Sequence, residues 1–382
     1  QQQQQQQQQD TTGLSSSSSR QQMALFAVCD GHGDNKRVSE YIASSVSGVL
    51  RECIATHECR TIVPSAEYWN DVWKGVCLQL DRNLKDAFLT EGGSTGVFAL
   101  VTEREIVVAN VGDSRCVLAR KESGAAAKTD NPGDKSSSSS SNDQGEPAIA
   151  PAATRTESAP AAGEESSDPP ALIEDEDDAK EDKTTLLSTP GDEYTVALAL
   201  SEDHKPNLPV EADRIQKAGF KVQSIAITED DGTETLVHKL LKNDKDQLAV
   251  SRAFGDFDYK ANENLGETEQ AVVPVADVRV HTRNPDTDLF LVLACDGIWD
   301  VMENQDVVDF VQAQLKNKSE HTSADSLLPD VADVLLHECL GRESRDNLSA
   351  ILVSLQQQQQ PGGGASTPAP MPPKALDFGS PK

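Results

Sequence analysis

The stretch MALFAVCDGHGD, residues 23–34, places an apolar run directly before an acid, a glycine and a histidine. The run from Met23 to Val28 is typical of a buried strand, and the glycines after it favour a sharp turn. The chain is therefore predicted to present Asp30 and His32 at the end of a strand. A carboxylate and an imidazole on such a turn are candidates for metal binding and proton transfer.

The same arrangement recurs once further along the chain, and its reverse occurs once. LFLVLACDGIWD, residues 289–300, is another apolar strand that ends in Cys-Asp-Gly, and SRDNLSAILV, residues 344–353, places an acid just before a strand. In an antiparallel sheet the start of one strand lies beside the end of its neighbour. We therefore expect Asp30, Asp296 and Asp346 to meet at one edge.

Three carboxylates in such a cluster would repel one another, by roughly 4 kcal/mol per pair at about 4 Å. They need protons or cations to coexist. Oxygen donors without histidine or cysteine ligands favour a hard ion, Mg²⁺ or Mn²⁺, and the Gly31 carbonyl is a further oxygen donor. For any single Asp here the alternative is ordinary turn chemistry, since Asp-Gly after a strand is a common turn signal.

The fold class follows from the pattern of strands and helices. Amphipathic helices are predicted from residue 38 to 54 and at 69–88, 208–219, 305–315 and 327–340, and strands at 24–29, 97–101, 106–111, 115–119, 194–200, 289–294 and 348–353. The short links between the strands from 97 to 119 demand antiparallel pairing. These elements predict an α+β fold in which antiparallel strands are covered by two pairs of helices.

Composition divides the chain into one domain and three low-complexity segments. Residues 1–22 are Gln/Ser-rich, residues 121–192 form an acidic insertion, and residues 356–382 form a tail; all three are predicted to be disordered. The domain therefore spans 23–355 with one interruption.

Charge and cysteine usage limit the partners and the compartment. The net charge of −29, which is not confined to the insertion, predicts no binding to nucleic acid or to anionic membranes. No apolar stretch is long enough to span a membrane. Seven cysteines without CxxC pairs predict reduced thiols and a cytoplasmic or nuclear location. The protein is also expected to be a monomer.

Several motifs occur in a family's order: LFAVCDGHG, GSTG, VANVGDSRCVLAR, LSEDHKPNLPVEADRIQKAGF, LAVSRAFGDFDYK, LFLVLACDGIWDVMENQDVVDFV and SRDNLSAILV. Across residues 24–355, apart from the insertion, the sequence closely resembles metal-dependent protein serine/threonine phosphatases of the 2C type, the PPM family. The resemblance implies a sandwich of two antiparallel β-sheets flanked by helix pairs, a four-layer αββα arrangement. It also implies a two-metal site at one end of the sandwich.

The resemblance assigns metal-binding roles to four positions. Asp30 matches the acid that bridges two Mg²⁺ or Mn²⁺ ions, and Gly31 matches a carbonyl ligand of one of them. Asp296 and Asp346 match the ligands of the other ion.

Three further roles are implied in the same way. Asp203 and Asp300 match acids linked to a weaker third metal, and His32 matches the general acid. The implied reaction is hydrolysis of phosphoserine or phosphothreonine in phosphorylated proteins by a water that bridges the two ions, without a phosphoenzyme. The family's other segments around the GDSR and SRAFGD motifs are interpreted as scaffold.

One part of the family pattern is not found. An arginine that grips the phosphate and a Glu-Asp pair normally precede the first motif, whereas residues 1–22 contain only Arg20, which we do not assign to that role, and no such pair. The chain is therefore expected to lack the family's N-terminal segment. The alternative function is a phosphatase-like pseudoenzyme that acts as a binding or scaffold domain.

Overall fold

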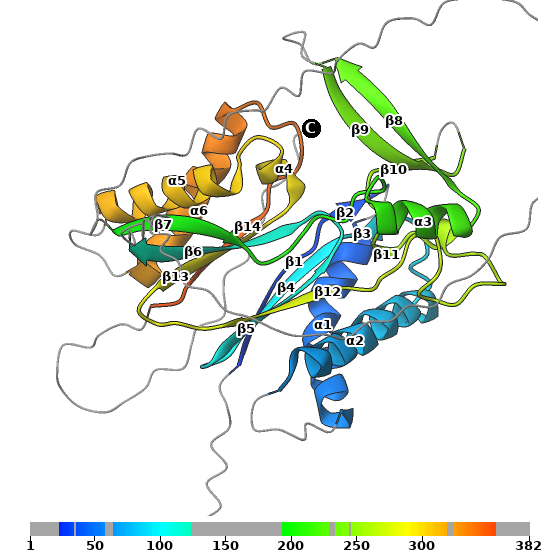
Figure 1. Cartoon of the computed structure of the whole chain (residues 1–382), viewed down its shortest axis with the longest axis horizontal. Helices are drawn as coiled ribbons and strands as arrows, with labels where there is room; N and C mark the ends of the chain where they lie inside the picture. Colours follow the sequence, from blue (N-terminus) through cyan, green and yellow to red (C-terminus); the bar gives the residue numbers. More distant parts are fainter. Residues whose placement is uncertain are drawn as a thin grey trace, which may run out of the picture. The chain divides into compact units, whose positions relative to one another are not determined.

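The computed structural model describes residues 23–33, 36–57, 64–123, 193–228, 234–243, 246–318 and 324–356. The predictions for residues 1–22, for nearly all of the insertion and for the tail after 356 lie outside these ranges. Apart from Ser123, the described residues belong to one unit of the chain, formed by Gln1–Glu122 and Glu193–Lys382. Figure 1 shows its helices and strands.

The first of two large sheets has the strand order β1-β4-β5-β12. Its members are β1 (Ala24–Val28), β4 (Gly96–Val101), β5 (Glu105–Val111) and β12 (Asp277–Thr282), and every neighbouring pair is antiparallel. A tight turn joins β4 to β5, where the Thr102 hydroxyl accepts a hydrogen bond from the backbone N–H of Glu105 at 2.8 Å. This turn fixes the antiparallel register that the short link predicts.

The second large sheet has the order β14-β13-β6-β7. It consists of β14 (Ala350–Ser354), β13 (Asp288–Ala294), β6 (Arg115–Ser123) and β7 (Glu193–Ala199), and β13 is antiparallel to both β14 and β6. All seven residues of β13 are buried, as expected of a central strand whose sheet is covered on both faces.

The strands alternate between two buried surfaces. On β4, Val97 and Ala99 belong to the apolar cluster shared with the second sheet, whereas Phe98 and Leu100 belong to the cluster shared with helices. On β13, Leu291 lies in the cluster between the sheets, and its neighbours on the strand pack on the other helix pair. Because successive side chains of a strand point to opposite faces of its sheet, three apolar layers lie between the two sheets and the two helix pairs. The predicted αββα sandwich is therefore confirmed.

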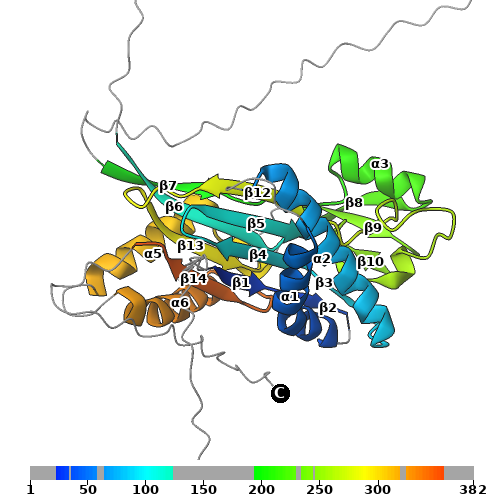
Figure 2. The ribbon, with the colours of Figure 1, turned by 90° about the horizontal axis from the view of Figure 1, so that it is seen from below.

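Two helix pairs form the outer layers, as predicted. The helices α1 (Arg37–Thr56) and α2 (Ala66–Asp86) cover the first sheet, and α5 (Asn304–Lys318) and α6 (Ala324–Gly341) cover the second (Figures 1 and 2). The Trp73 ring on α2 stacks on Phe98 with 5.2 Å between centroids. Within the described ranges, no helix is long and apolar enough to cross a bilayer.

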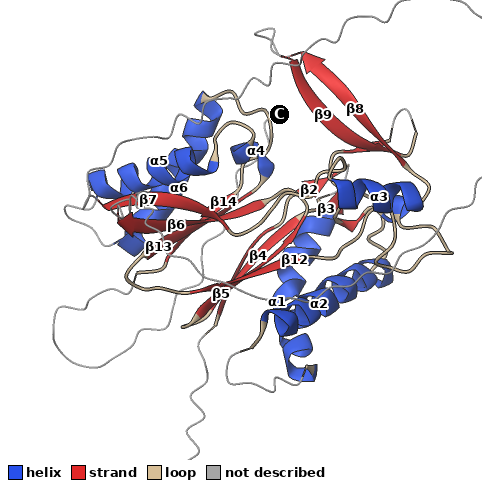
Figure 3. Ribbon diagram, in the orientation of Figure 1, coloured by secondary structure: helices blue, strands red, loops and turns tan. Residues whose placement is uncertain are grey.

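The sequence analysis missed the strand β12 of the first large sheet and several smaller elements. The smaller elements are β2 (Gly31–His32), β3 (Gly93–Ser94), β8 (Lys221–Thr228), β9 (Glu234–Leu241), β10 (Gln247–Leu248), β11 (Phe254–Gly255), a 3₁₀ helix at Phe257–Tyr259, and α4 (Asp296–Trp299). Figure 3 shows the hairpin β8–β9 and the helix α4 clearly. The predicted short helix is α3 (Pro209–Lys217). The hairpin β8–β9 gives no clear periodic signal because few of its described side chains are fully buried.

The layered core predicts a large cost for truncating a side chain between the sheets. Leu291→Ala removes a side chain with 0% exposure, and we expect it to lower the free energy of unfolding by about 2–5 kcal/mol. Leu236→Ala, on a side chain that is 57% exposed, should change it by less than about 0.5 kcal/mol. Urea denaturation measures both, and equal losses would contradict the assignment of the core.

Candidate functional site

The acids predicted to meet are carried by strands of both sheets. Asp30 follows β1 and Asp296 follows β13, and a carboxylate oxygen of each lies with the Cys295 sulfur in a group whose atoms are all within 4.8 Å of one another. The two strands belong to different sheets but are in contact. The end of the sandwich therefore brings together two acids that are 266 positions apart in the numbering.

Asp346 lies beside this pair rather than inside it. Its side chain is exposed, and its Oδ1 accepts a hydrogen bond from the backbone N–H of Asn347 at 2.6 Å. Its charge is nevertheless among the causes that raise the pKa of both Asp30 and Asp296. The three strand ends thus converge, while the ligand roles of these acids stay predictions.

Burial and neighbouring acids both act on Asp296. Burial, followed by the charges of Asp113, Asp30, Asp300 and Asp346, raises the pKa of this carboxyl to about 8. Its Oδ1 is buried and has no hydrogen-bond partner among the described residues. A buried acceptor without a donor is costly, so this oxygen is a suitable ligand for a cation.

The chemistry of the donors suits a hard ion. Carboxylate oxygens predominate, and burial together with Asp30 raises the pKa of the Cys295 thiol to about 12. A thiol that stays protonated is a poor metal ligand, and this one lies 3.2 Å from the Asn347 carbonyl, to which it can donate. The residues present therefore fit Mg²⁺ or Mn²⁺, and Asp30 and Asp296 stay its predicted ligands.

Asp113 belongs to the same acidic cluster, although the sequence analysis treated its GDSR motif as scaffold. Its side chain is buried, it follows β5 after Gly112, and it is the first of the charges that raise the pKa of Asp296. Lys205 neutralises it through an ion pair of 2.5 Å. A signal was present, because an apolar strand followed by Gly-Asp resembles the two other strand ends.

The two acids predicted to hold a third ion have different surroundings. Asp300 caps the C-terminus of α4 and contributes to the field at Asp296. Both oxygens of Asp203 accept hydrogen bonds from Arg115, at 3.1 and 2.9 Å. Both roles stay predictions, and in this structure the Asp203 carboxylate is held by an arginine.

His32 lies on β2, two residues after Asp30. Its Nε2 is 2.6 Å from Oδ2 of Asp256, a residue that the sequence analysis did not single out. Burial alone would lower the pKa of this imidazole, but the hydrogen bond and charge of Asp256, together with Asp113 and Asp30, raise it above its ordinary value. Gly31 pairs with Ser94, and its carbonyl stays a predicted ligand.

A charge network supports the loop that carries Asp113. The backbone N–H of Gly112 donates to Nδ1 of His204 at 3.1 Å, and the His204 Nε2 lies 3.1 Å from Asp277. Because Nδ1 accepts, Nε2 is the nitrogen that donates to the carboxylate. Asp277 in turn accepts from Arg252 at 2.6 Å.

The network ends at a buried acid on α3. Glu211 is 2% exposed and accepts hydrogen bonds from Arg252 at 2.8 and 3.1 Å, and it forms an ion pair of 2.8 Å with Arg214. Burial alone would raise the pKa of Glu211, but the two guanidinium groups outweigh it and lower the pKa to about 2. The carboxylate is therefore a stabilising anion at neutral pH.

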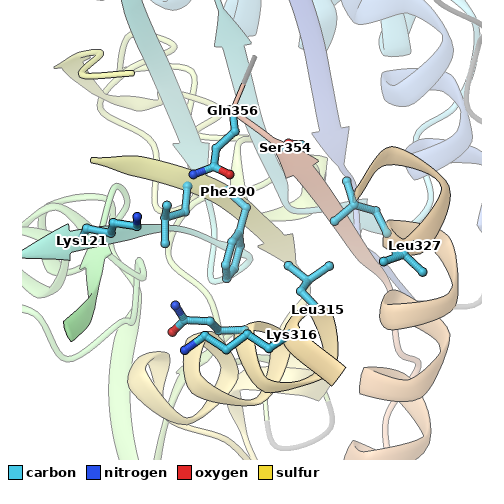
Figure 4. Close-up of a pocket in the computed structure, with 10 residues that line it drawn as sticks. Lys121, Phe290, Leu315, Lys316, Leu327, Ser354 and Gln356 are labelled. Carbon is cyan, nitrogen blue, oxygen red and sulfur yellow. The ribbon is translucent and has the colours of Figure 1, made fainter. Parts of the chain in front are cut away.

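A hollow of about 300 Å³ elsewhere in the molecule is not part of this site (Figure 4). It lies at the opposite end of β13 and β14, where Phe290 and Ser354 line it, and its lining contains no acidic residue. The labelled side chains in Figure 4 are apolar or carry amide, hydroxyl or amino groups. It therefore offers no oxygen cluster for a metal.

Comparison with known proteins gives the following matches. A family model described as "Protein phosphatase 2C" matches residues 2–135 and 182–348, which contain all six predicted ligands. Protein phosphatase ppm-1.A of Caenorhabditis elegans is 28% identical over 344 residues, 86% of this chain and 52% of that protein. Human protein phosphatase 1A is 39% identical over 153 residues, 40% of this chain and 34% of that protein. The chain thus spans about half or less of these relatives.

The solved structures agree with the observed architecture. A crystal structure of a phosphatase from a pathogenic strain of Toxoplasma gondii matches with a TM-score of 0.54 at 22% identity, over 88% of this chain and 86% of that chain. A structure of a C. elegans sex determining protein matches with a TM-score of 0.51 at 17% identity, over 87% of this chain and 57% of that chain. At these identities the matches support the fold alone.

The cluster predicts binding of divalent cations. Calorimetric titration with Mn²⁺ should reveal two sites, and Asp296→Asn should weaken binding by at least about 100-fold, because it removes a direct ligand rather than an outer partner. Asp286→Asn, on an exposed turn, is the matched control and should bind as the unmodified protein does. Absence of any site would instead favour the pseudoenzyme.

The charge network predicts a defined pH dependence of stability. The folded-state pKa of Glu211 is about 2 against an ordinary value of 4.5, so its contribution is present above pH 4.5 and is lost as the pH falls toward 2. Glu211→Gln should cost about 3–5 kcal/mol of unfolding free energy at pH 7, and this difference should shrink below pH 4.5. Urea denaturation across that range, with the exposed Glu263→Gln as control, would refute the assignment if the two curves stayed parallel.

Proposed function

Because the chain belongs to the protein phosphatase 2C family, we propose that it hydrolyses phosphoserine and phosphothreonine in proteins. In this proposal the nucleophile is a water between two Mg²⁺ or Mn²⁺ ions, and His32 is the general acid. The observation that carries it is the close approach of the carboxyl groups of Asp30 and Asp296, beside the imidazole of His32, at one end of the sandwich.

Each residue has one task in the proposed site. Asp30 is assigned to both ions and the Gly31 carbonyl to one of them, while Asp296 and Asp346 are assigned to the other. When bound, the ions would polarise the attacking water and offset negative charge on the phosphoryl oxygens. Burial, followed by the charges of neighbouring acids, raises the pKa of Asp296. Nearby cations would favour its ionised form, which supports this assignment.

A weaker third ion is also part of the proposal. It would lie near Asp300 and Asp203, and Asp113 extends the same group of acids. Arg115 binds Asp203 and Lys205 binds Asp113 in the structure, so Asp300 is the better-placed donor. The substrates are phosphorylated proteins, and a monomer suffices for the reaction because the described chain itself carries these acids.

The cysteines near the site argue against a covalent route. A phosphocysteine intermediate requires a reactive thiolate. Burial raises the pKa of both the Cys29 and the Cys295 thiol to about 12, with Asp30 adding to the effect. A phosphocysteine intermediate is therefore disfavoured, which supports direct attack by water on phosphorus.

The proposal predicts loss of turnover when the shared ligand is removed. Asp30→Asn in the full-length protein should lower Mn²⁺-dependent phosphate release from a phosphothreonine peptide by at least about 10³-fold. A catalytic metal contributes several kcal/mol of transition-state stabilisation, and each 1.4 kcal/mol is tenfold in rate.

The control for this assay is Asp86→Asn, an exposed acid at the end of α2, which should leave the rate unchanged. The assay counts against the proposal if the unmodified full-length protein releases no phosphate, or if Asp30→Asn retains most of its rate.

A further inference from the structure

The contact between His32 and Asp256 joins two distant parts of the chain. The Nε2 of His32 and Oδ2 of Asp256 are 2.6 Å apart and 224 residues apart in sequence. The imidazole lies on β2, and Asp256 follows β11; both strands pair with β3. The Asp256 side chain is 8% exposed and the His32 side chain 30% exposed, so this is a short hydrogen bond with a buried acceptor.

Asp256 adopts a backbone conformation that disfavours it locally. Its φ of 49° and ψ of 43° lie in the left-handed region, which costs an L-residue about 1–2 kcal/mol. Three hydrogen bonds hold it there. Its N–H donates to Gly92 O at 2.9 Å, its carbonyl accepts from the Tyr259 N–H at 2.9 Å, and the preceding Gly255 N–H donates to Asp81 at 2.8 Å. A strained backbone conformation that several neighbouring contacts hold in place is typical of functional positions.

The strand β3 leaves room for this contact at one position. A β-carbon at Gly93 would collide with both the Asp256 carboxylate and the His32 Nε2. Any larger residue at position 93 would therefore push the two groups apart. The pairing of acid and imidazole is thus built into three segments of the sheet.

The bond determines which imidazole nitrogen can exchange a proton. An ionised carboxylate can only accept, so Nε2 carries a hydrogen whether the ring is neutral or charged. The proton count of the ring can then change only at Nδ1, which has no hydrogen bond to any of the described residues. Catalytic triads use the same logic with the two nitrogens exchanged.

We propose that Asp256 is a positioning residue that binds Nε2–H of His32, so that Nδ1 is the nitrogen that protonates the leaving oxygen of the substrate. This inference rests on the proposed function and adds to it the positioning residue Asp256 and the proton-donating atom Nδ1 of His32. Asp256 does not touch the substrate; it fixes the rotamer and the tautomer of the group that does.

The proposed step balances in atoms and charge. The bond from phosphorus to the seryl or threonyl oxygen breaks, and its electron pair stays on that oxygen. The proton on Nδ1 moves to it, which leaves a neutral imidazole that still carries its hydrogen on Nε2. The attacking water loses a proton as it bonds to phosphorus, and through solvent this proton restores the charged ring.

A purely structural role for Asp256 is the competing explanation, and leaving-group dependence separates the two. A general acid matters for a poor leaving group such as an alkoxide and little for p-nitrophenolate. Asp256→Gly removes the carboxylate and keeps a residue suited to positive φ. We expect its kcat on a phosphothreonine peptide and on phenyl phosphate to fall about 100-fold, with KM unchanged and with p-nitrophenyl phosphate turned over within about threefold of the unmodified rate.

Two further variants complete the comparison. His32→Gln should show the same selectivity between leaving groups, and the double variant should lose no more than His32→Gln alone, because the two residues act as a unit. Asp258→Asn is the matched control: it lies two residues further along, is largely exposed and pairs with Lys242, and it should behave as the unmodified protein. If Asp256→Gly does not fold, Asp256→Asn replaces it, since asparagine also tolerates positive φ.

A spectroscopic measurement tests the hydrogen bond independently of turnover. Two-bond ¹H–¹⁵N spectra of the metal-free protein, with the His32 signal assigned from His32→Gln, should show the hydrogen of the neutral ring on Nε2. Asp256→Gly should abolish this preference.

The outcomes are distinct. An equal fall on all three substrates, an unchanged rate, or a hydrogen on Nδ1 of the neutral ring would overturn the inference. An unmodified protein that releases no phosphate from any substrate would instead overturn the proposed function itself.

Discussion

Repulsion among carboxylates at one end of the sandwich is the constraint on which the rest of the structure depends. Two unit charges about 4 Å apart repel by about 4 kcal/mol at an intermediate dielectric, a large part of the 5–15 kcal/mol that stabilises an ordinary domain. Asp30 and Asp296 share a site, and Asp113 adds its field to theirs. The fold must therefore hold these groups together by forces that act elsewhere.

Those forces lie in the three apolar layers. Strands from both sheets end at the acids, and the alternation of side chains on β4 and β13 buries one face of each strand between the sheets and the other beneath helices. The acids themselves sit just beyond the buried segments, where a strand has ended and a turn has begun. Lys205 pairs with Asp113 and Arg115 pairs with Asp203. A bound cation would supply the remaining positive charge beside Asp30 and Asp296.

The sequence predicts the layers and the central acids well because both depend on local patterns. Most strands of the two large sheets are apolar runs, and Asp30 and Asp296 each follow one. The strand β12, which reads DVRVHT and has no fully buried residue, was missed because it is not such a run. Asp113 was missed as a member of the cluster although it follows the same pattern, since its motif was interpreted as scaffold. Asp256 could not be recognised in the same way, because its importance arises from a left-handed backbone and from a partner 224 residues away. No periodicity or spacing encodes such a contact.

The buried pair of Asp81 and Lys260 links the outer helix layer to this chemistry. All three hydrogen-bonding positions of the Lys260 ammonium are used, two by the Asp81 carboxylate and one by the Ala253 carbonyl, each at 2.9 Å. One of these two oxygens, Oδ1 of Asp81, also accepts a hydrogen bond from the Gly255 N–H. Random substitution of the chain should therefore impair activity at two positions, Asp81 on α2 and Lys260, which lie outside the acidic cluster at the end of the sandwich.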